Sequence, residues 1–588
     1  MPADSRIDSS AGAERAITAV LFALAVGLGI AANALAASSV SLDQGVVRAG
    51  AVCAAAGVAL IVLWFQSRKW RLTMDVVSFG VFGVTLVLLV AAYFTAELRA
   101  ILYRADMLIW SESPFVNDII KFRSGGTLYG TPADFDSFNY TPGAPLLTWS
   151  LASLVGLGDS VPAYRVIQVL LVAIASAMGV RTVSLIRALR GAERPGLPWV
   201  MVWFPLLFLA ATNGLTNQFT HLLHNDALGL LICAASFLVL AEYAVRPRTW
   251  LLVAMVLLPA AGFLTKQSLG IWCVLFGAWL LFFDRPVRFW RAVAVGGGGL
   301  ALTLALYAGG RAIWGADFQY WVIEGLGKHE VSPLRSIQHA LDGWMFWVVG
   351  LWAGLLLLRG ERLRPLLGLW LVWGLLFAVE TYTSGIAWML NHMGPGSFLA
   401  VVWLAAALPS VWPTARPAEG PTWLAWLRAG AFTVLAVFAL NGLSAVRVPS
   451  TSLPRDADRY VSEIEREFEG MSPATVLLDN GSWQYIRAGV VQKDRSSPAA
   501  EAGWTGTADF TRFFDRIRTH YYDRILVREL HGEEFMYDYG SWEKRSGARD
   551  SLLRYYREVR VIPEVAGYDR VSLRSINVLE PVSSKPSR

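Results

Sequence analysis

The sequence predicts a polytopic α-helical membrane protein that carries an α/β domain at its C-terminal end. Of its 588 residues, 55% are hydrophobic and 16% are charged, and the mean hydropathy is +0.45. Ordinary soluble domains carry about 25% charged residues. The shortage of charge and the repeated apolar runs of about 20 residues indicate membrane-spanning helices. After about residue 447 the apolar runs shorten and charge rises, which indicates a second, water-exposed domain.

About 13 segments are long and apolar enough to span a membrane. We predict spans at 16–36, 47–65, 76–96, 162–186, 197–213, 222–244, 249–265, 267–283, 292–313, 341–358, 363–384, 397–412 and 424–446. The first run is long enough to span, and "ANALAASS" at its end is a weak match to a cleavage site. We therefore expect a retained helix and no cleavable signal peptide.

The distribution of Lys and Arg among the loops predicts the orientation in the cell membrane. With the N-terminus inside, the short cytoplasmic loops contain 17 Lys and Arg residues, whereas the longer opposite loops contain about seven. This bias follows the positive-inside rule. The loops at 97–141 and 314–340 and the chain after residue 447 are thus expected outside the cytoplasm. The net charge of +6 reflects membrane topology and does not indicate a nucleic-acid partner.

The region after residue 447 alternates between helical and strand patterns. "DADRYVSEIEREFEGM" and "DFTRFFDRIRTHY" have helical periodicity, whereas "ATVLLD", "DRILVREL", "REVRVIPEV" and "SINVLEP" are typical of strands. The alternation predicts a small α/β domain. The three cysteines, Cys53, Cys233 and Cys273, all lie in apolar segments, where packing is expected and a disulfide or metal site is not.

The loop at 97–141 contains a predicted interfacial helix. In "SESPFVNDIIKFRSGG", Ser113 suits the cap, Pro114 suits the first helical position, and Gly125 and Gly126 end the helix. Apolar side chains share one face and polar side chains share the other, so we expect the helix to lie along the membrane surface. "APLLTWSLASLVG" predicts a second interfacial helix.

Two carboxylates of this loop are candidate general bases. Glu112 comes just before the helix, where exposed N–H groups favour its ionised form, and Asp118 lies on the polar face. A structural role is also open for each. Glu112 could only complement the helix dipole, and Asp118 could pair with Lys121 at a spacing of three residues.

Polar residues at the outer ends of later spans form further candidate sites. His221 and His224 are expected on one helix face, where they could bind a metal with Asp226. The interpretation we favour is that they cap a helix and line a wet cavity. Lys266, between two apolar helices, is costly at that depth and could bind a lipid phosphate or extend to the interface. His392 could contact phosphate or sugar hydroxyls, or cap a helix.

The order of these features resembles the GT-C superfamily, polytopic glycosyltransferases that use polyprenyl-phosphate sugars. The likeness is to the branch of bacterial aminoarabinose transferases and protein O-mannosyltransferases, whose first outer loop begins with an Asp-Glu pair followed by an aromatic residue and a glycine. Here Ser111 and Glu112 take the place of the pair, Phe115 is the aromatic residue and Gly126 is the glycine. The "G..LY" segment and the "NYTPG" turn at Tyr140 add to the resemblance.

The resemblance has consequences for the domains and for the base. It makes residues 1–75 a two-helix N-terminal addition, 76–446 a GT-C-like core and 447–588 an extracytoplasmic domain. The family's usual catalytic Asp falls on Ser111, which cannot act as a carboxylate base. Either Glu112 or Asp118 has taken that role, or the chain represents a different branch.

The function that the resemblance implies is transfer of a sugar from a polyprenyl-phosphate donor to a glycan, lipid or protein of the cell envelope, with inversion. No cofactor is firmly implied, and a divalent metal is an option. The residues expected to bind substrate or lipid phosphate are Lys121, Arg123, Tyr140, His221, His224, Asp226, Lys266, Glu324, His329, Glu330, Asn391 and His392.

Two other functions stay open at this point. A transporter or flippase of a lipid-linked glycan would have the same hydropathy, but two related halves with broken helices are not evident in the sequence. No Walker motif is present, which disfavours an ATP-driven transporter. A non-catalytic GT-C-like protein is the second alternative, because Ser111 replaces the usual acid.

Overall fold

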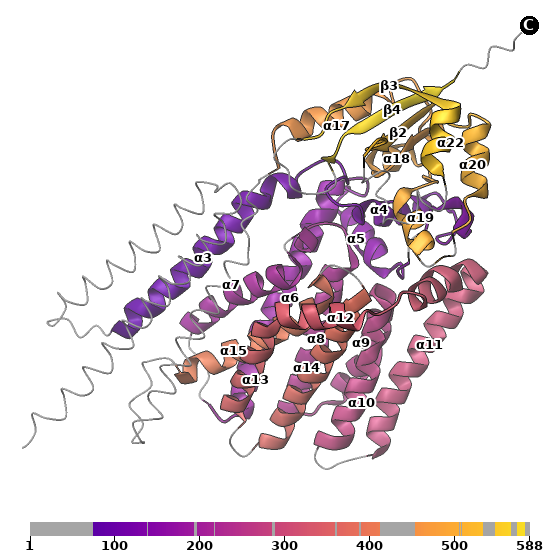
Figure 1. The fold of residues 1–588 in the computed structure, drawn as a ribbon. Helices are drawn as coiled ribbons and strands as arrows, with labels where there is room; N and C mark the ends of the chain where they lie inside the picture. Colours follow the sequence, from indigo (N-terminus) through magenta and orange to yellow (C-terminus); the bar gives the residue numbers. More distant parts are fainter. Residues whose placement is uncertain are drawn as a thin grey trace, which may run out of the picture.

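The computed structural model describes residues 74–137, 139–192, 197–216, 218–284, 289–358, 362–386, 390–411, 453–504, 506, 508–532, 547–565 and 573–582. A bundle of long helices forms one end of the molecule, and a sheet with its helices lies over the other end (Figure 1). The predicted spans at 16–36, 47–65 and 424–446 lie outside the described residues.

The bundle consists of apolar helices that run between its two ends. They are α3 (Met74–Ile101), α6 (Val161–Leu189), α7 (Leu197–Gly214), α8 (Asn225–Val245), α9 (Thr249–Thr265), α10 (Trp272–Phe283), α11 (Phe289–Gln319), α13 (Trp344–Leu357), α14 (Leu363–Thr383) and α15 (Gly394–Val411). Within the described ranges, six helices are long and apolar enough to cross a membrane, or up to seven if α12 (Pro333–Asp342) and α13 form one bent span. The described chain therefore has the multi-pass helical architecture that the apolar runs predict.

Small residues allow some of these helices to approach closely. A Cβ atom on Gly296 of α11 would lie 3.2 Å from the Cα atom of Gly277 on α10, a tight contact that the two helices would have to separate slightly to accommodate. Close backbone approach at small residues is a general device of helix packing in membranes. Cys233 and Cys273 are buried and form no disulfide, and Cys233 Sγ accepts a hydrogen bond from Trp272 Nε1, in agreement with the packing role expected for them.

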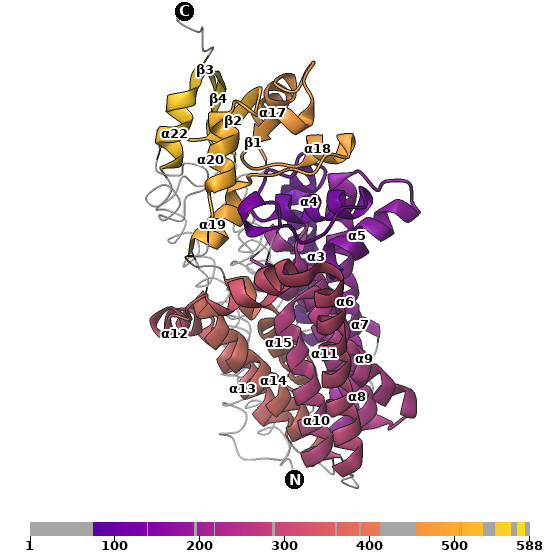
Figure 2. The same ribbon diagram turned by 90° about the vertical axis from the view of Figure 1, so that its right-hand side faces the viewer.

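Helices α4 (Glu112–Arg123) and α5 (Gly143–Leu154) lie between the bundle and the sheet (Figure 2). Helix α4 begins earlier than expected, with Ser111 at its N-cap and Pro114 as its third residue. It ends as predicted, since Gly125 has a φ of 69°. The expected position on the membrane surface is wrong for α4, because α18 (Trp483–Ala488) covers it and even Asn117 and Lys121 are buried.

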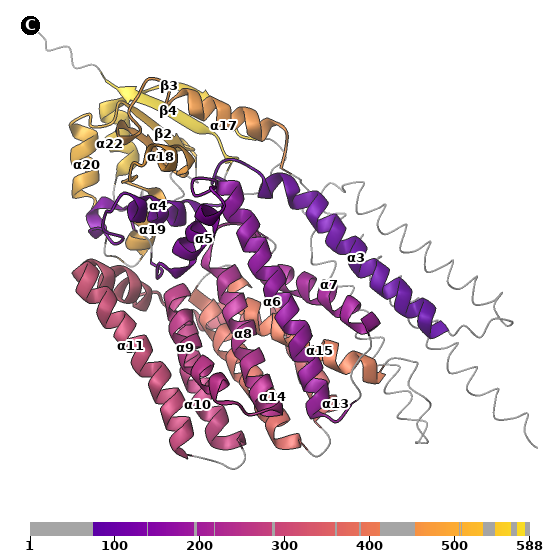
Figure 3. The same ribbon diagram turned by 180° about the vertical axis from the view of Figure 1, so that it is seen from behind.

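The C-terminal part forms a four-stranded mixed sheet in the order β1-β2-β4-β3. Strands β1 (Val476–Leu478) and β2 (Arg524–Arg528) are parallel, whereas β4 (Ile576–Pro581) is antiparallel to both β2 and β3 (Tyr556–Ile562). The other helices here are α17 (Asp456–Arg466), α19 (Ser496–Trp504), α20 (Thr511–Arg518) and α22 (Ala548–Tyr555). All four predicted strands and both predicted helices occur, and α18 and α19 turn toward α4 (Figure 3).

Short helical turns complete the described structure. They are η2 (Pro132–Asp134), η3 (Gln218–Thr220), η4 (Gln267–Ile271), η5 (Tyr320–Gly325), η6 (Ser384–Ile386), η7 (Leu390–Met393) and η8 (Pro473–Thr475). Several of them, η3, η4 and η7 among them, interrupt the chain where bundle helices reach the end nearest the sheet. Polar side chains gather at these interruptions.

Candidate active site

Asp226 is the centre of a buried polar cluster at the end of the bundle that faces α4. Its Oδ1 accepts a hydrogen bond from Lys266 Nζ at 2.9 Å, and its Oδ2 accepts one from Asn391 Nδ2 at 2.6 Å. His224 Nδ1 lies 2.9 Å from the same Oδ2 atom. Asp226 is in the first turn of α8, Lys266 at the break between α9 and η4, and Asn391 in η7. Three interrupted helices thus bring together four residues predicted from the sequence.

Lys266 is the most accessible member of this cluster. Its side chain is 15% exposed, compared with 4% for Asp226 and 5% for His224. A buried ammonium needs a compensating charge, and Asp226 supplies it. An ammonium has three N–H donors and one of them is used by Asp226, so Lys266 can still donate to an anionic ligand. The half-buried His392 lies in the same turn as Asn391.

Aromatic rings connect this cluster to α4. Phe115 stacks on Tyr140 with the ring centroids 5.8 Å apart, and His224 packs edge-on against both rings at 5.0 and 5.7 Å. Burial raises the pKa of the Tyr140 phenol, and the nearby carboxylates of Asp226 and Glu501 add to this effect. Tyr140 is therefore a neutral hydrogen-bond donor at physiological pH.

Glu112 forms a fully buried ion pair with Arg165 of α6. Its Oε1 accepts from Arg165 Nε at 2.8 Å and from the Leu223 backbone N–H at 3.0 Å, and its Oε2 lies 2.5 Å from Arg165 Nη2. Arg165 also donates to the backbone carbonyls of Ala100, Tyr103 and Ala105. Because both carboxylate oxygens have donors and no surface is exposed, the geometry favours a structural role for Glu112.

Asp118 is the less constrained carboxylate of α4. It is half-buried, and none of the described residues donates a hydrogen bond to its carboxylate or forms an ion pair with it. Burial raises the pKa of Asp118 to about 7, although the positive charges of Lys121 and Arg495 lower it in part. A carboxylate with a pKa near the working pH is well suited to act as a general base.

Lys121 and Arg123 of α4 have structural partners. The buried Lys121 ammonium donates to Asp136 Oδ1 at 2.9 Å, to Ser137 Oγ at 2.6 Å and to the Leu128 carbonyl at 2.9 Å. All three of its donors are used, which leaves none for a lipid phosphate, and its pairing with Asp118 does not occur. Arg123 donates to the Ile486 carbonyl of α18 and is paired with Asp159.

The predicted loop at 314–340 approaches the C-terminal part through His329. His329 Nε2 lies 3.2 Å from Oε2 of Glu501 in α19, and Asn139 Nδ2 donates to the same oxygen at 3.3 Å. Glu330 is exposed, and the exposed Glu324 accepts a hydrogen bond from Gln319. Among the candidates Glu324, His329 and Glu330, His329 is the one that contacts Glu501, whose carboxylate lies near Tyr140.

The expected helix face of His221 and His224 is wrong. Both residues precede α8, and His221 lies near the Tyr93 hydroxyl at 3.5 Å and Glu97 Oε2 at 3.7 Å, away from Asp226. No group of three metal-ligating side chains occurs in the part of the chain that the structure describes. His224 occupies the N-cap position of α8, but its side chain makes no capping hydrogen bond, so the expected capping role is not seen there.

Buried charges that the sequence analysis did not single out attach the C-terminal part to α4. Asp106 accepts hydrogen bonds from the backbone N–H groups of Ser482 and Trp483 at 2.8 and 2.9 Å. Burial raises the pKa of Asp106 to about 6, with a contribution from the Glu112 charge. Arg495 is fully buried and donates to the hydroxyls of Ser113 and Ser482. Asp106 and Arg495 are each a single charge in a polar segment, and no local sequence pattern indicates that they make these long-range contacts.

Comparison with known proteins supports the fold. No protein-family model and no curated protein matches this sequence. Among solved structures, ArnT from Cupriavidus metallidurans bound to undecaprenyl phosphate gives a TM-score of 0.52 at 15% identity, covering 85% of this chain and 98% of ArnT. The apo state of ArnT from the same organism gives 0.49 at 15% identity, covering 84% and 97%.

A more distant similarity is to the archaeal oligosaccharyltransferase AglB from Archaeoglobus fulgidus, in complex with an inhibitory peptide and a dolichol-phosphate. Its TM-score is 0.46 at 12% identity, covering 75% of this chain and 69% of that protein. The similarity extends over most of both chains and shows that this chain shares the fold of ArnT, in agreement with the GT-C-like architecture that the sequence motifs led us to expect.

Proposed function

We propose that this protein is a membrane glycosyltransferase that moves a sugar from a polyprenyl-phosphate donor to a hydroxyl group of a cell-envelope acceptor. The observation that carries the proposal is the Lys266–Asp226 cluster, which lies under α4 at one end of a GT-C-fold bundle. A partly accessible cation in this position suits the phosphate of a lipid donor. Undecaprenyl phosphate bound to ArnT is consistent with such a donor.

In the proposed reaction, Asp118 accepts the proton of the acceptor hydroxyl. The acceptor oxygen forms a bond to the anomeric carbon as the bond from that carbon to the phosphate oxygen breaks. Polyprenyl phosphate leaves, and Lys266 stabilises the charge on its phosphate. Because phosphate is already a good leaving group, one carboxylate base is sufficient, and a single displacement inverts the anomeric configuration.

The remaining predicted residues have supporting roles in this proposal. Tyr140, His224 and Asn391 orient the donor around Asp226, while His329 and Glu501 lie toward the acceptor side. Glu112 holds α4 in place through Arg165 and is not the base.

The proposed reaction takes place on the extracytoplasmic side. The C-terminal sheet covers the end of the bundle that carries Lys266. Arg181, Arg246 and Arg248 lie at the opposite end of α6 and α8, where the positive-inside rule expects the cytoplasm. The acceptor is then a glycan, lipid or protein of the cell envelope.

Binding of undecaprenyl phosphate to the purified full-length protein tests the role of Lys266. Titration followed by intrinsic tryptophan fluorescence should show a fall in affinity of roughly 10- to 100-fold for Lys266→Gln, since a hydrogen bond to a charged group contributes about 1.5–3 kcal/mol. Lys266→Arg should restore part of the affinity. Lys328→Gln, in an exposed loop position, is the matched control and should bind normally. Wild-type affinity in Lys266→Gln would show that the phosphate binds elsewhere.

A further inference from the structure

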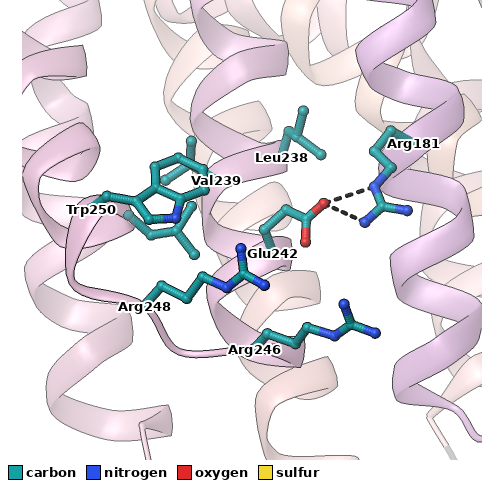
Figure 4. Close-up of a pocket in the computed structure, with 8 residues that line it drawn as sticks. Arg181, Leu238, Val239, Glu242, Arg246, Arg248 and Trp250 are labelled. Atoms are coloured by element: carbon teal, nitrogen blue, oxygen red, sulfur yellow. Dashed lines mark hydrogen bonds and ion pairs between the residues drawn. The ribbon is translucent and has the colours of Figure 1, made fainter.

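A second basic site lies at the end of the bundle opposite the C-terminal sheet. Residues of α6, of α8, of the turn after α8 and of α9 enclose a pocket of about 260 Å³ (Figure 4). Its lining residues are Arg181, Leu238, Val239, Glu242, Arg246, Arg248, Trp250 and Leu251. Pockets for drug-sized ligands occupy about 300–1,000 Å³, so this one suits a small group such as a phosphate.

The charges in this pocket are unbalanced. Glu242 is the single carboxylate, and its Oε1 accepts from Arg181 Nε at 2.7 Å and lies 2.6 Å from Arg181 Nη2. Arg246 and Arg248 are exposed and form no ion pair with any described residue. Figure 4 shows the guanidinium groups of all three arginines around the Glu242 carboxylate. The site therefore has an excess of positive charge, which favours an anion.

The backbone next to the pocket adds to this preference. Helix α9 has 17 residues and begins at Thr249, and Arg248 at its N-cap provides no side-chain capping bond. The first N–H groups of a helix and the positive end of its dipole favour a bound anion. This contribution comes in addition to the arginine side chains that line the cavity.

An apolar stripe on α9 leads away from the pocket. Trp250, Val253 and Leu257 are 56%, 53% and 53% exposed, and their spacing of three and four residues places them on one face. A tryptophan at the start of such a stripe is typical of the membrane interface. A headgroup in the pocket would have its acyl chains along this stripe, which a free phosphate ion would not use.

We propose that this pocket binds the phosphate of an anionic phospholipid of the adjacent leaflet, with Arg246 and Arg248 as its main ligands and Arg181 held in position by Glu242. The site is at the other end of the bundle from Lys266 and is independent of the glycosyl donor. Basic pockets between transmembrane helices are known to bind anionic headgroups on the cytoplasmic side.

Thermal unfolding of the full-length protein in a neutral detergent tests this proposal. Phosphatidylglycerol should raise the unfolding temperature, whereas phosphatidylcholine and inorganic phosphate should not. The apparent affinity for phosphatidylglycerol should fall on the order of 30-fold in Arg246→Gln/Arg248→Gln, which removes two interfacial cations. Arg190→Gln/Arg364→Gln removes two cations at the same end without touching the pocket lining and should retain the wild-type affinity.

Three results would overturn the proposal. An equal loss of phosphatidylglycerol affinity in the two double variants would mean that the lipid is attracted by the general positive charge of this end and not by the pocket. An equal effect of inorganic phosphate would identify a pocket for a free anion. Equal stabilisation by phosphatidylcholine would show that the acyl chains act without the headgroup. Because Arg246 and Arg248 are exposed and unpaired among the described residues, their replacement should leave folding intact, which the unfolding temperature without added lipid checks directly.

Discussion

At the scale of single residues, three carboxylates near α4 differ in what their partners allow them to do. Glu112 is neutralised by Arg165, Asp226 is shared among Lys266, His224 and Asn391, and Asp118 has no donor among the described residues. Only Asp118 combines accessibility with a pKa near 7. All three residues are carboxylic acids, so it is their hydrogen-bond and ion-pair partners that distinguish the structural carboxylates from the candidate base.

Glu112→Gln should destabilise the protein by about 3–5 kcal/mol, because it leaves the Arg165 guanidinium buried without its counter-charge. Thermal unfolding in detergent measures the change. Glu324→Gln, at an exposed carboxylate, is the matched control and should change the stability little. Replacing both partners, in Glu112→Gln/Arg165→Met, should recover part of the loss. A Glu112→Gln protein of wild-type stability that has lost sugar transfer would instead identify Glu112 as the base.

Asp118 should make both activity and stability depend on pH. The raised pKa means that the folded state holds the proton more tightly than the unfolded chain, so stability should fall as pH rises from about 4 to 7. Asp118→Asn should remove the contribution of Asp118 to this fall, whereas the contribution of Asp106, whose pKa is raised to about 6, should remain. The rate of the wild-type protein should rise through pH 7 as the base ionises. Denaturant titrations over this pH range measure the stability, and identical profiles for Asp118→Asn and wild type would contradict the assignment.

The sequence could predict most of these residues but not their pairing. Lys266 and Asp226 stand out as charges next to apolar helices, and the structure brings them together. Arg165 has the same signal, a charge near the start of an apolar helix, yet nothing local shows that it reaches Glu112 across 53 residues of chain. Long-range ion pairs depend on tertiary packing, which no local spacing encodes.

At the scale of elements, α4 shows how a helix can be predicted correctly and placed wrongly. Its amphipathic pattern and its glycine stop give the right element. Such a pattern is equally satisfied by a membrane surface and by a protein domain that covers the polar face. Here α18 covers it, and Asn117 bonds to the Gln492 backbone at 3.0 Å and to the Asp136 carbonyl at 2.8 Å. The covering segment lies more than 350 residues away, so the sequence around α4 could not reveal it.

Helix α20 is attached to the first loop by Asp134, which binds Arg512 at 3.0 Å and Arg516. Burial works against ionisation, but the hydrogen bond from Arg516 and the neighbouring cations outweigh it and lower the pKa of Asp134. This stabilisation is present above the ordinary Asp pKa and is lost as pH falls through the lowered value. Asp134→Asn should therefore weaken the contact at neutral pH by about 1–3 kcal/mol.

Hydrogen exchange of the amides in α20 measures this weakening. Exchange should be faster in Asp134→Asn and unchanged in Asp515→Asn, which removes an exposed acid from the same helix. Equal protection of α20 in Asp134→Asn and wild type would show that the helix is held by other contacts.

At the scale of the whole molecule, the bundle and the C-terminal sheet enclose the site from two sides. Interrupted helices supply Asp226, Lys266 and Asn391 to the proposed site, and we propose that α4 supplies Asp118 as the base. The apolar runs and the loop charges predicted a multi-pass bundle, since these signals are local. The sequence did not predict how the two parts dock, because that depends on buried contacts such as those of Asp106 and Arg495.

Release of polyprenyl phosphate tests sugar transfer most directly. The purified full-length protein is incubated in vesicles with polyprenyl-phosphate sugars and envelope material extracted from bacterial membranes, and mass spectrometry quantifies the lipid products. We predict protein-dependent formation of free polyprenyl phosphate, reduced about 10²- to 10⁴-fold in Asp118→Asn. Undecaprenyl phosphate binding should stay normal in that variant. Intact donor lipids in the presence of the wild-type protein, or full release by Asp118→Asn, would contradict the proposed reaction.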